Sequence, residues 1–114
     1  MTTSNANEPW KVELNEQSYD ETLATAEGVV IVDFWAAWCG PCRAVAPVLE
    51  DLARTSGGKV TLAKVNVDDN PALAMRFGIR SIPTILFVKD GKVRDQVIGA
   101  LPRQQLEARL AALA

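Results

Sequence analysis

The apolar positions of this chain gather in short runs separated by polar segments. The longest run extends from Val29 to Trp35 and is interrupted only by Asp33. Its nearly continuous apolar character predicts a strand buried on both faces, as the central strands of parallel sheets are. Four further apolar runs predict strands over residues 10–14, 60–67, 84–88 and 93–98.

Apolar residues at helical spacing follow the run at residues 10–14 and the run at residues 29–35. Ser18 and Glu21 form an S-x-x-E capping box that opens a short helix, and Gly28 ends it. Apolar residues over 41–55 predict a second helix. Pro47 lies inside that helix and removes one backbone hydrogen bond, so a kink is expected there.

The C-terminal half continues the alternation of strands and helices. Asn70 and Pro71 suit the N-cap and first position of a third helix, and a fourth helix follows Pro102. Asp90-Gly91, between the last two strands, predicts a tight antiparallel hairpin. The order of elements therefore indicates an α/β fold, with a mixed five-stranded sheet flanked by four helices.

Composition limits the size, location and partners of the protein. The 114 residues suit one compact domain, placed at residues 10–114, after a polar segment (1–9) that we expect to be a flexible tail. That segment lacks the features of a signal peptide, and no apolar run is long enough for a membrane helix, so a cytoplasmic location is the default expectation. The net charge is −2 and the basic residues are scattered, which argues against nucleic acid as a partner.

The only two cysteines, Cys39 and Cys42, lie directly after the predicted central strand in the sequence Trp-Cys-Gly-Pro-Cys. A helix N-terminus stabilises a thiolate by its partial positive charge and unpaired N–H groups. The chain has no histidine, which excludes Cys-His catalysis and a Cys₂His₂ zinc site. A passive disulfide across so short a loop contributes roughly 2 kcal/mol, against about 4.7 for a hundred-residue loop. A redox-active pair is therefore favoured over metal binding or a structural disulfide.

The chain resembles the thioredoxin family in its order of elements and in two segments, Trp38-Cys39-Gly40-Pro41-Cys42 and Ile79-Arg80-Ser81-Ile82-Pro83-Thr84. The resemblance begins at about Trp10 and covers nearly all of the chain from there. It implies the thioredoxin fold and a general protein-disulfide reductase, an electron carrier in cell redox homeostasis that works by dithiol–disulfide exchange. It also implies that no cofactor is bound, and that NADPH supplies electrons through a flavin-dependent thioredoxin reductase.

The resemblance assigns roles to residues around the dithiol. Cys39 precedes the helix, so we expect it to be the more exposed thiol and the nucleophile, with Cys42 as the resolving cysteine. Gly40 and Pro41 form the turn, and the family resemblance implies that they tune the reduction potential. Asp33 is surrounded by apolar residues, so burial should raise its pKa. The resemblance implies that this carboxyl accepts a proton from Cys42 during resolution.

Two further positions have an ordinary and a functional interpretation. Lys64 lies on the same strand face as two apolar residues, which fits a lysine whose stem is covered while its ammonium reaches solvent. In the family this position lies near the buried aspartate and modulates its charge. Trp35 is interpreted as core packing or as a lid under the dithiol rather than as a substrate contact.

Substrate contacts are expected on the surface around the reactive sulfur. Trp38 is adjacent to Cys39, and aromatic residues of this kind are enriched at interfaces. The resemblance implies a cis Ile82-Pro83 peptide bond beside the dithiol, where the Ile82 backbone pairs with an extended substrate segment. It also implies that Gly99 keeps the substrate groove open.

These expectations define the partners and the rival functions. The expected partners are thioredoxin reductase and disulfide-containing client proteins, with a monomeric chain and no bound metal or membrane. One alternative is a specialised thiol oxidase or isomerase on the same fold. Another is a redox-independent binding module or folding helper, whose apolar surface around Trp38 and Pro83 matters more than its sulfurs.

Overall fold

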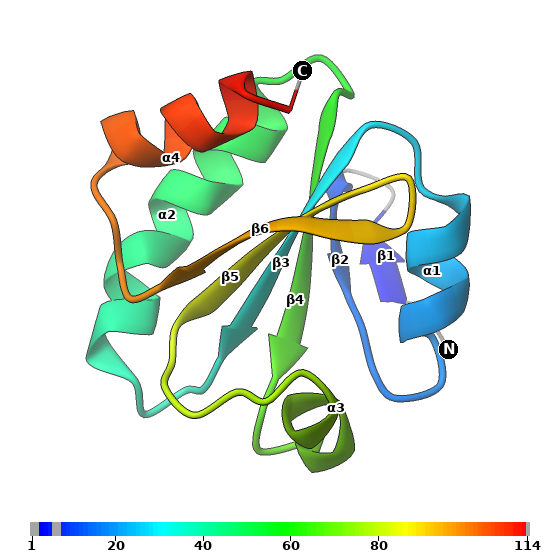
Figure 1. The fold of residues 1–114 in the computed structure, drawn as a ribbon, viewed down its shortest axis with the longest axis vertical. Helices are drawn as coiled ribbons and strands as arrows, with labels where there is room; N and C mark the ends of the chain where they lie inside the picture. The colour runs from blue at the N-terminus through cyan, green and yellow to red at the C-terminus, as the bar shows by residue number, and fades with distance from the viewer. Residues whose placement is uncertain (1–2, 6–7, 114) are drawn as a thin grey trace.

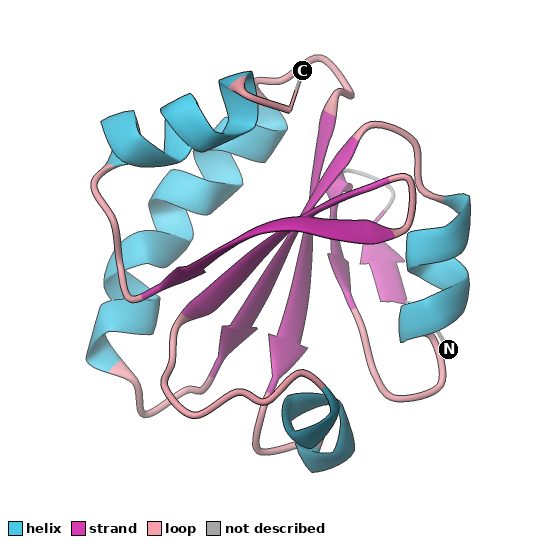
Figure 2. Cartoon of the chain, viewed as in Figure 1, coloured by secondary structure: helices cyan, strands magenta, loops and turns pink. Residues whose placement is uncertain are grey.

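The structure, a computed structural model, describes residues 3–5 and 8–113. Within these residues six strands form one mixed sheet in the order β1-β2-β4-β3-β5-β6, with four helices around it (Figure 1). Helices α2 and α4 cover one face of the sheet, and α1 and α3 lie on the other side (Figure 2). The predicted mixed sheet flanked by four helices is confirmed.

The bounds of the elements, apart from β1, agree with the predicted ones to within a few residues. The strands are β1 (Thr3–Asn5), β2 (Glu8–Glu13), β3 (Val29–Trp35), β4 (Val60–Asn66), β5 (Thr84–Lys89) and β6 (Lys92–Ile98). The helices are α1 (Tyr19–Thr25), α2 (Gly40–Arg54), α3 (Pro71–Arg76) and α4 (Arg103–Ala111). None of these described helices has the length and apolar character needed to cross a membrane.

Strand β3 is the centre of the molecule. It pairs in parallel with β4 on one side and antiparallel with β5 on the other. Val30, Val32 and Phe34 pack into the core beneath α1 and α3. Val29 and Ile31 point to the opposite face and pack beneath α2 and α4. Because helices cover both faces, the strand is apolar at every position except Asp33, as the sequence predicts.

The sheet has one edge strand more than the five predicted. Strand β1 pairs antiparallel with β2, and it lies in the segment 1–9 that the sequence analysis assigned to a flexible tail. Backbone groups pair along a sheet edge without needing an apolar side-chain pattern, so the polar sequence did not indicate a strand. The rest of that segment before β2, residues 1–2 and 6–7, lies outside the described residues.

The start of α1 differs from the predicted capping box. Ser18 is the N-cap, but its side chain makes no capping hydrogen bond. Instead, the Asn15 side-chain oxygen accepts hydrogen bonds from the N–H groups of Gln17 and Ser18, both at 2.9 Å. The turn before the helix is thus organised by an asparagine, which competes effectively with serine for local backbone donors.

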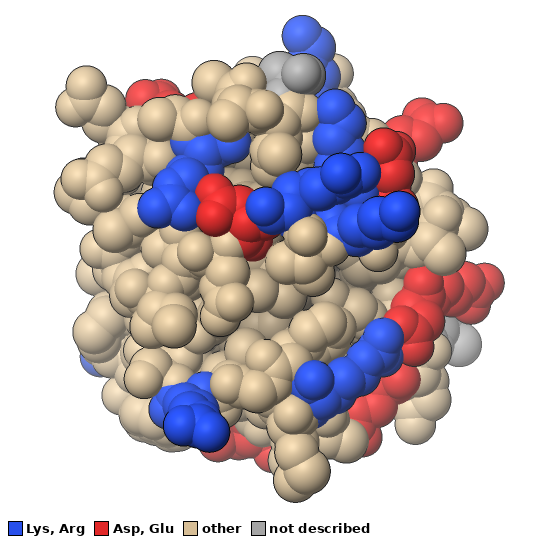
Figure 3. Space-filling view, viewed as in Figure 1, with Lys and Arg blue, Asp and Glu red and all other residues tan. Residues whose placement is uncertain are grey.

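The hairpin between β5 and β6 is confirmed. Asp90 and Gly91 have φ values of 54° and 75°, the left-handed conformation that a two-residue hairpin turn requires. Figure 3 shows basic and acidic side chains intermixed over β6. Asp95 of β6 forms an ion pair with Arg109 of α4 at 2.8 Å.

Candidate active site

The two cysteines lie at the start of α2, directly after the short loop that follows β3. Cys39 is the N-cap, Gly40 begins the helix, and Pro41 occupies its first turn. Proline suits this position because its fixed φ is helical and its missing N–H would have no partner there. Cys39 and Cys42 form a disulfide with their Cα atoms 5.3 Å apart. The structure therefore represents the oxidised protein.

The helix N-terminus contacts the sulfur of Cys39 directly. The backbone N–H of Cys42 donates a hydrogen bond to the Cys39 Sγ at 3.2 Å. In the reduced protein the same N–H and the helix dipole would stabilise a thiolate at Cys39. The exposed fractions of Cys39 and Cys42 are 4% and 2%, so the predicted difference in exposure is small.

An apolar groove lies next to the disulfide. It has a volume of about 170 Å³ and is lined by Trp38, Val67, Ala74, Ile79, Arg80 and Ile82. Trp38 is 68% exposed, and its indole N–H donates a hydrogen bond to Asp68 at 2.9 Å. Of the lining residues, Trp38 and Ile82 are the ones expected from the sequence as substrate contacts. The others come from the β4–α3 loop, from α3 itself and from the α3–β5 loop, and no local pattern indicates that these segments lie close to Trp38.

The Ile82-Pro83 peptide bond is cis, as the resemblance implies. The carbonyl oxygen of Ile82 lies 3.7 Å from the Cys39 Sγ. The N–H of Gly99 donates a hydrogen bond to the Pro83 carbonyl at 2.8 Å, so Gly99 lies beside the same segment. Gly99 has a φ of +99°, and a Cβ added there would meet nothing within 4 Å. Two chain segments thus meet here: Ile82 contacts the dithiol, and Gly99 lies beside the adjacent Pro83.

Asp33 lies on the face of β3 that is covered by α2. Its side chain is fully buried, and neither carboxylate oxygen has a hydrogen-bond partner among the described residues. Burial raises its pKa to about 6, although the charge of Lys64 acts in the opposite direction. A carboxyl with such a pKa can both accept and release a proton near neutral pH.

Lys64 lies directly opposite Asp33 in the parallel register of β3 and β4. It is 9% exposed, which fits a position beside the buried carboxyl better than a surface lysine. Its Nζ lies 4.6 Å from the centroid of the Trp35 ring, a cation–π distance. Trp35 in turn packs against the cluster of Ala36, Cys39 and Cys42.

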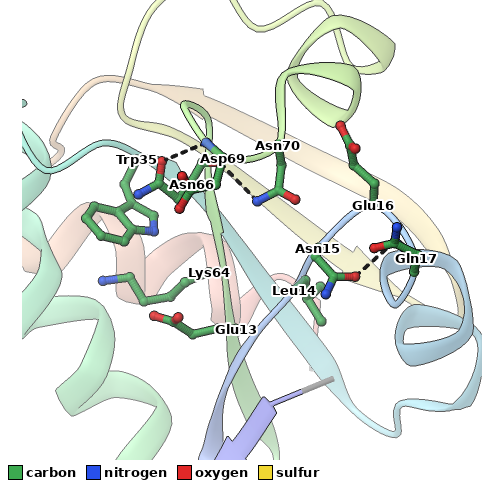
Figure 4. Close-up of a pocket in the computed structure, with 10 residues that line it drawn as sticks. All are labelled: Glu13, Leu14, Asn15, Glu16, Gln17, Trp35, Lys64, Asn66, Asp69 and Asn70. Atoms are coloured by element: carbon green, nitrogen blue, oxygen red, sulfur yellow. Dashed lines mark hydrogen bonds between the residues drawn. The ribbon is translucent and has the colours of Figure 1, made fainter. Parts of the chain in front are cut away.

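A polar pocket of about 410 Å³ opens on the other side of Trp35 and Lys64 (Figure 4). It is bordered by Glu13 of β2, Asn66 of β4 and the loops that follow both strands. No local sequence pattern predicts this pocket, because it is formed by strand ends and loops from three parts of the chain. Glu13 pairs in register with Lys64, so one wall of the pocket is charged.

The described residues do not form a metal centre. No group of three or more cysteine, aspartate or glutamate side chains among them is placed to hold an ion, and histidine is absent from the sequence.

Comparison with known proteins identifies the relatives of this chain. The thioredoxin family model matches residues 11–112. Thioredoxin 2 of Chlorobaculum tepidum is 49% identical over 98 residues, covering 86% of this chain and 90% of that protein. Thioredoxin of Alicyclobacillus acidocaldarius is 58% identical over 82 residues, covering 72% and 78%. The chloroplastic M-type thioredoxin of Pisum sativum is 47% identical over 97 residues, which span 85% of this chain and only 56% of that protein.

Proposed function

The chain belongs to the thioredoxin family, and we propose that it acts as a general protein-disulfide reductase through dithiol–disulfide exchange at Cys39 and Cys42. The observation that carries this function is the disulfide at the N-terminus of α2, where the backbone N–H of Cys42 donates a hydrogen bond to the Cys39 sulfur. It is a pair that can be reduced and reoxidised without a bound cofactor.

The reaction consists of two exchanges. The Cys39 thiolate attacks one sulfur of a client disulfide, so that a mixed disulfide forms and the other client sulfur leaves as a thiolate. Cys42 then attacks the Cys39 sulfur, which forms the Cys39–Cys42 disulfide and releases the second client thiolate. Two electrons pass from the protein dithiol to the client disulfide.

Asp33 is proposed as the proton acceptor for Cys42 in the second exchange. Cys42 must lose its proton to attack, and a buried carboxyl with a pKa of about 6 is basic enough to take it. Lys64 modulates that basicity through its charge, and Gly40 and Pro41 tune the reduction potential by fixing the start of α2. The unpartnered oxygens of Asp33 support this role, because they are free to accept a hydrogen bond.

The client is proposed to bind across the groove beside the disulfide. Trp38 provides an exposed apolar surface, and the Ile82 backbone faces the attacking sulfur at 3.7 Å. An extended client segment can pair with this backbone while its disulfide reaches Cys39. Pro83 and Gly99 border the same place, and a side chain at Gly99 would project into the space that the client needs.

Thioredoxins act with thioredoxin reductases and disulfide-containing clients, and we propose the same for this chain. Its dithiol would be regenerated by a flavin-dependent reductase that draws electrons from NADPH. The proposed location is the cytoplasm and the proposed state a monomer, although chloroplastic proteins are among the relatives.

Insulin reduction in the presence of dithiothreitol tests the function. The wild-type chain should accelerate precipitation of the insulin B chain, whereas Cys39→Ser should abolish the acceleration. Mixed with insulin after the dithiothreitol has been removed, pre-reduced Cys42→Ser should accumulate a mixed disulfide with the client, detectable by mass. Full acceleration by the Cys39→Ser, Cys42→Ser double variant would contradict the proposal and favour the redox-independent helper.

A further inference from the structure

Asp33 and Lys64 are neighbours in the sheet, but their side chains form no hydrogen bond with each other. Their Cα atoms are register partners on adjacent parallel strands, and both side chains are buried. A buried carboxylate and a buried ammonium so placed would ordinarily form a direct ion pair. Both oxygens of Asp33 nevertheless lack a hydrogen-bond partner among the described residues. Glu13 of β2, the register partner of Lys64, is the other carboxylate beside the ammonium, but it is not within ion-pair distance of it. The contact that the ammonium does make is an aromatic one.

The group that meets the ammonium is the indole of Trp35. The Lys64 Nζ lies 4.6 Å from the ring centroid, and Figure 4 shows the lysine side chain lying alongside the ring at the edge of the polar pocket. Tryptophan offers the most favourable aromatic face for a cation. The ring also packs against the cluster that contains Cys39 and Cys42, so it contacts both the ammonium and the surroundings of the dithiol.

The other charges around Asp33 do not take over the role of this lysine. From α2, Glu50 acts on Asp33 as a like charge, and its own ion-pair partner is Lys11 of β2 at 3.1 Å. From β5, the register partner of Asp33 is the apolar Ile85. Lys64 is therefore the cation that faces Asp33, and its position governs how strongly the carboxylate form is stabilised.

We propose that Trp35 is a positioning residue for proton transfer, whose indole face holds the Lys64 ammonium out of a direct ion pair with Asp33. The inference rests on the proposed role of Asp33 as proton acceptor. A closely paired carboxylate would be a weak base toward Cys42, whereas an isolated one would be costly to ionise. Trp35 holds the Lys64 ammonium between these two extremes, close enough to act on Asp33 but not paired with it. This gives Trp35 a function beyond covering the dithiol.

The test is a titration of the Asp33 carboxyl by ¹³C NMR in the oxidised protein, in which neither cysteine titrates. Trp35→Leu should lower the pKa of Asp33 by about one unit, since an opposite charge at close range lowers a carboxyl pKa by 1–3 units. Trp35→Phe should retain most of the wild-type pKa of Asp33, because phenylalanine keeps an aromatic face. Trp38→Leu, a matched control beside the dithiol, should leave this titration unchanged.

Water entering the space left by the indole would also lower the pKa, so the same substitution is repeated in a Lys64→Gln background. The proposal requires the effect of Trp35→Leu to be largely lost there. An equal decrease in both backgrounds, or no decrease with Lys64 present, would overturn it. The proposed role of Asp33 is tested separately, by the rate of mixed-disulfide resolution in Asp33→Asn. An undiminished rate would refute that role, while the titration results for the Trp35 variants would still stand.

Discussion

At the scale of single residues, the cost of burying Asp33 is the main physical feature of the site. Its folded pKa of about 6 lies above the ordinary value of 3.8. The ionised form is therefore less stable in the folded protein than in the unfolded chain. This cost is absent below about pH 3.8, grows as the pH rises, and is fully present above about pH 6.

The first residue-scale prediction concerns stability. Asp33→Asn removes the buried charge, so the free energy of unfolding at pH 7.5 should rise by about 1–3 kcal/mol. The gain should shrink as the pH falls below 6 and be largely lost at pH 3.8. Denaturant unfolding of the oxidised proteins across this range measures it.

The control for that measurement is Asp69→Asn, which replaces an exposed carboxylate in the β4–α3 loop. It should change the stability by less than about 0.5 kcal/mol at either pH. A destabilised Asp33→Asn variant at pH 7.5, with an unaffected control, would show that the carboxylate of Asp33 has a partner that compensates its charge.

The second residue-scale prediction concerns Lys64. Its charge lowers the pKa of Asp33, opposing the larger effect of burial. Lys64→Gln should therefore raise the pKa of Asp33 above about 6 and move the pH dependence of resolution upwards in the same direction. Single-turnover resolution of a mixed disulfide, followed from pH 5 to 9, measures this. An unshifted pH profile would mean that Asp33 does not control the step.

At the scale of elements, α3 is held by a contact from a distant loop. The predicted N-cap Asn70 makes no side-chain capping bond, and the Asn70 side chain donates instead to the Asn66 carbonyl. The N–H of Ala72, in the first turn of α3, donates a hydrogen bond to a carboxylate oxygen of Glu16 at 2.8 Å. Glu16 follows β2, so the loop before α1 caps the helix that precedes the client groove.

The prediction at this scale is that Glu16→Ala loosens the start of α3. The variant loses both a hydrogen bond and a favourable charge at the helix N-terminus, which together contribute about 1 kcal/mol. Amide hydrogen exchange in α3 should accelerate about fivefold, while exchange in α4 should not change. Gln17→Ala, at the adjacent exposed position, is the control. Equal protection of α3 in both variants would mean that the cap contributes nothing.

At the scale of the whole molecule, what the sequence revealed depends on whether a feature is local. The apolar run around Asp33 predicted both a central strand and a raised carboxyl pKa, and the Cys-Gly-Pro-Cys segment predicted a dithiol at a helix start. The Glu16–Ala72 contact joins residues 56 positions apart, and no local pattern indicates it. The pocket beside Lys64 escaped prediction for the same reason, because strand ends and loops from three parts of the chain form it. Strand β1 pairs with its neighbour β2 but has a polar sequence, so no apolar pattern indicated it.

The reduction potential of the Cys39–Cys42 couple tests the central claim most directly. Equilibration against a thiol–disulfide buffer, with the reduced fraction quantified by alkylation, measures it. The account predicts a potential near about −270 mV, the general value for thioredoxins, as a reductant of client disulfides requires. A value near about −120 mV, typical of a strong disulfide-forming oxidant, would contradict it.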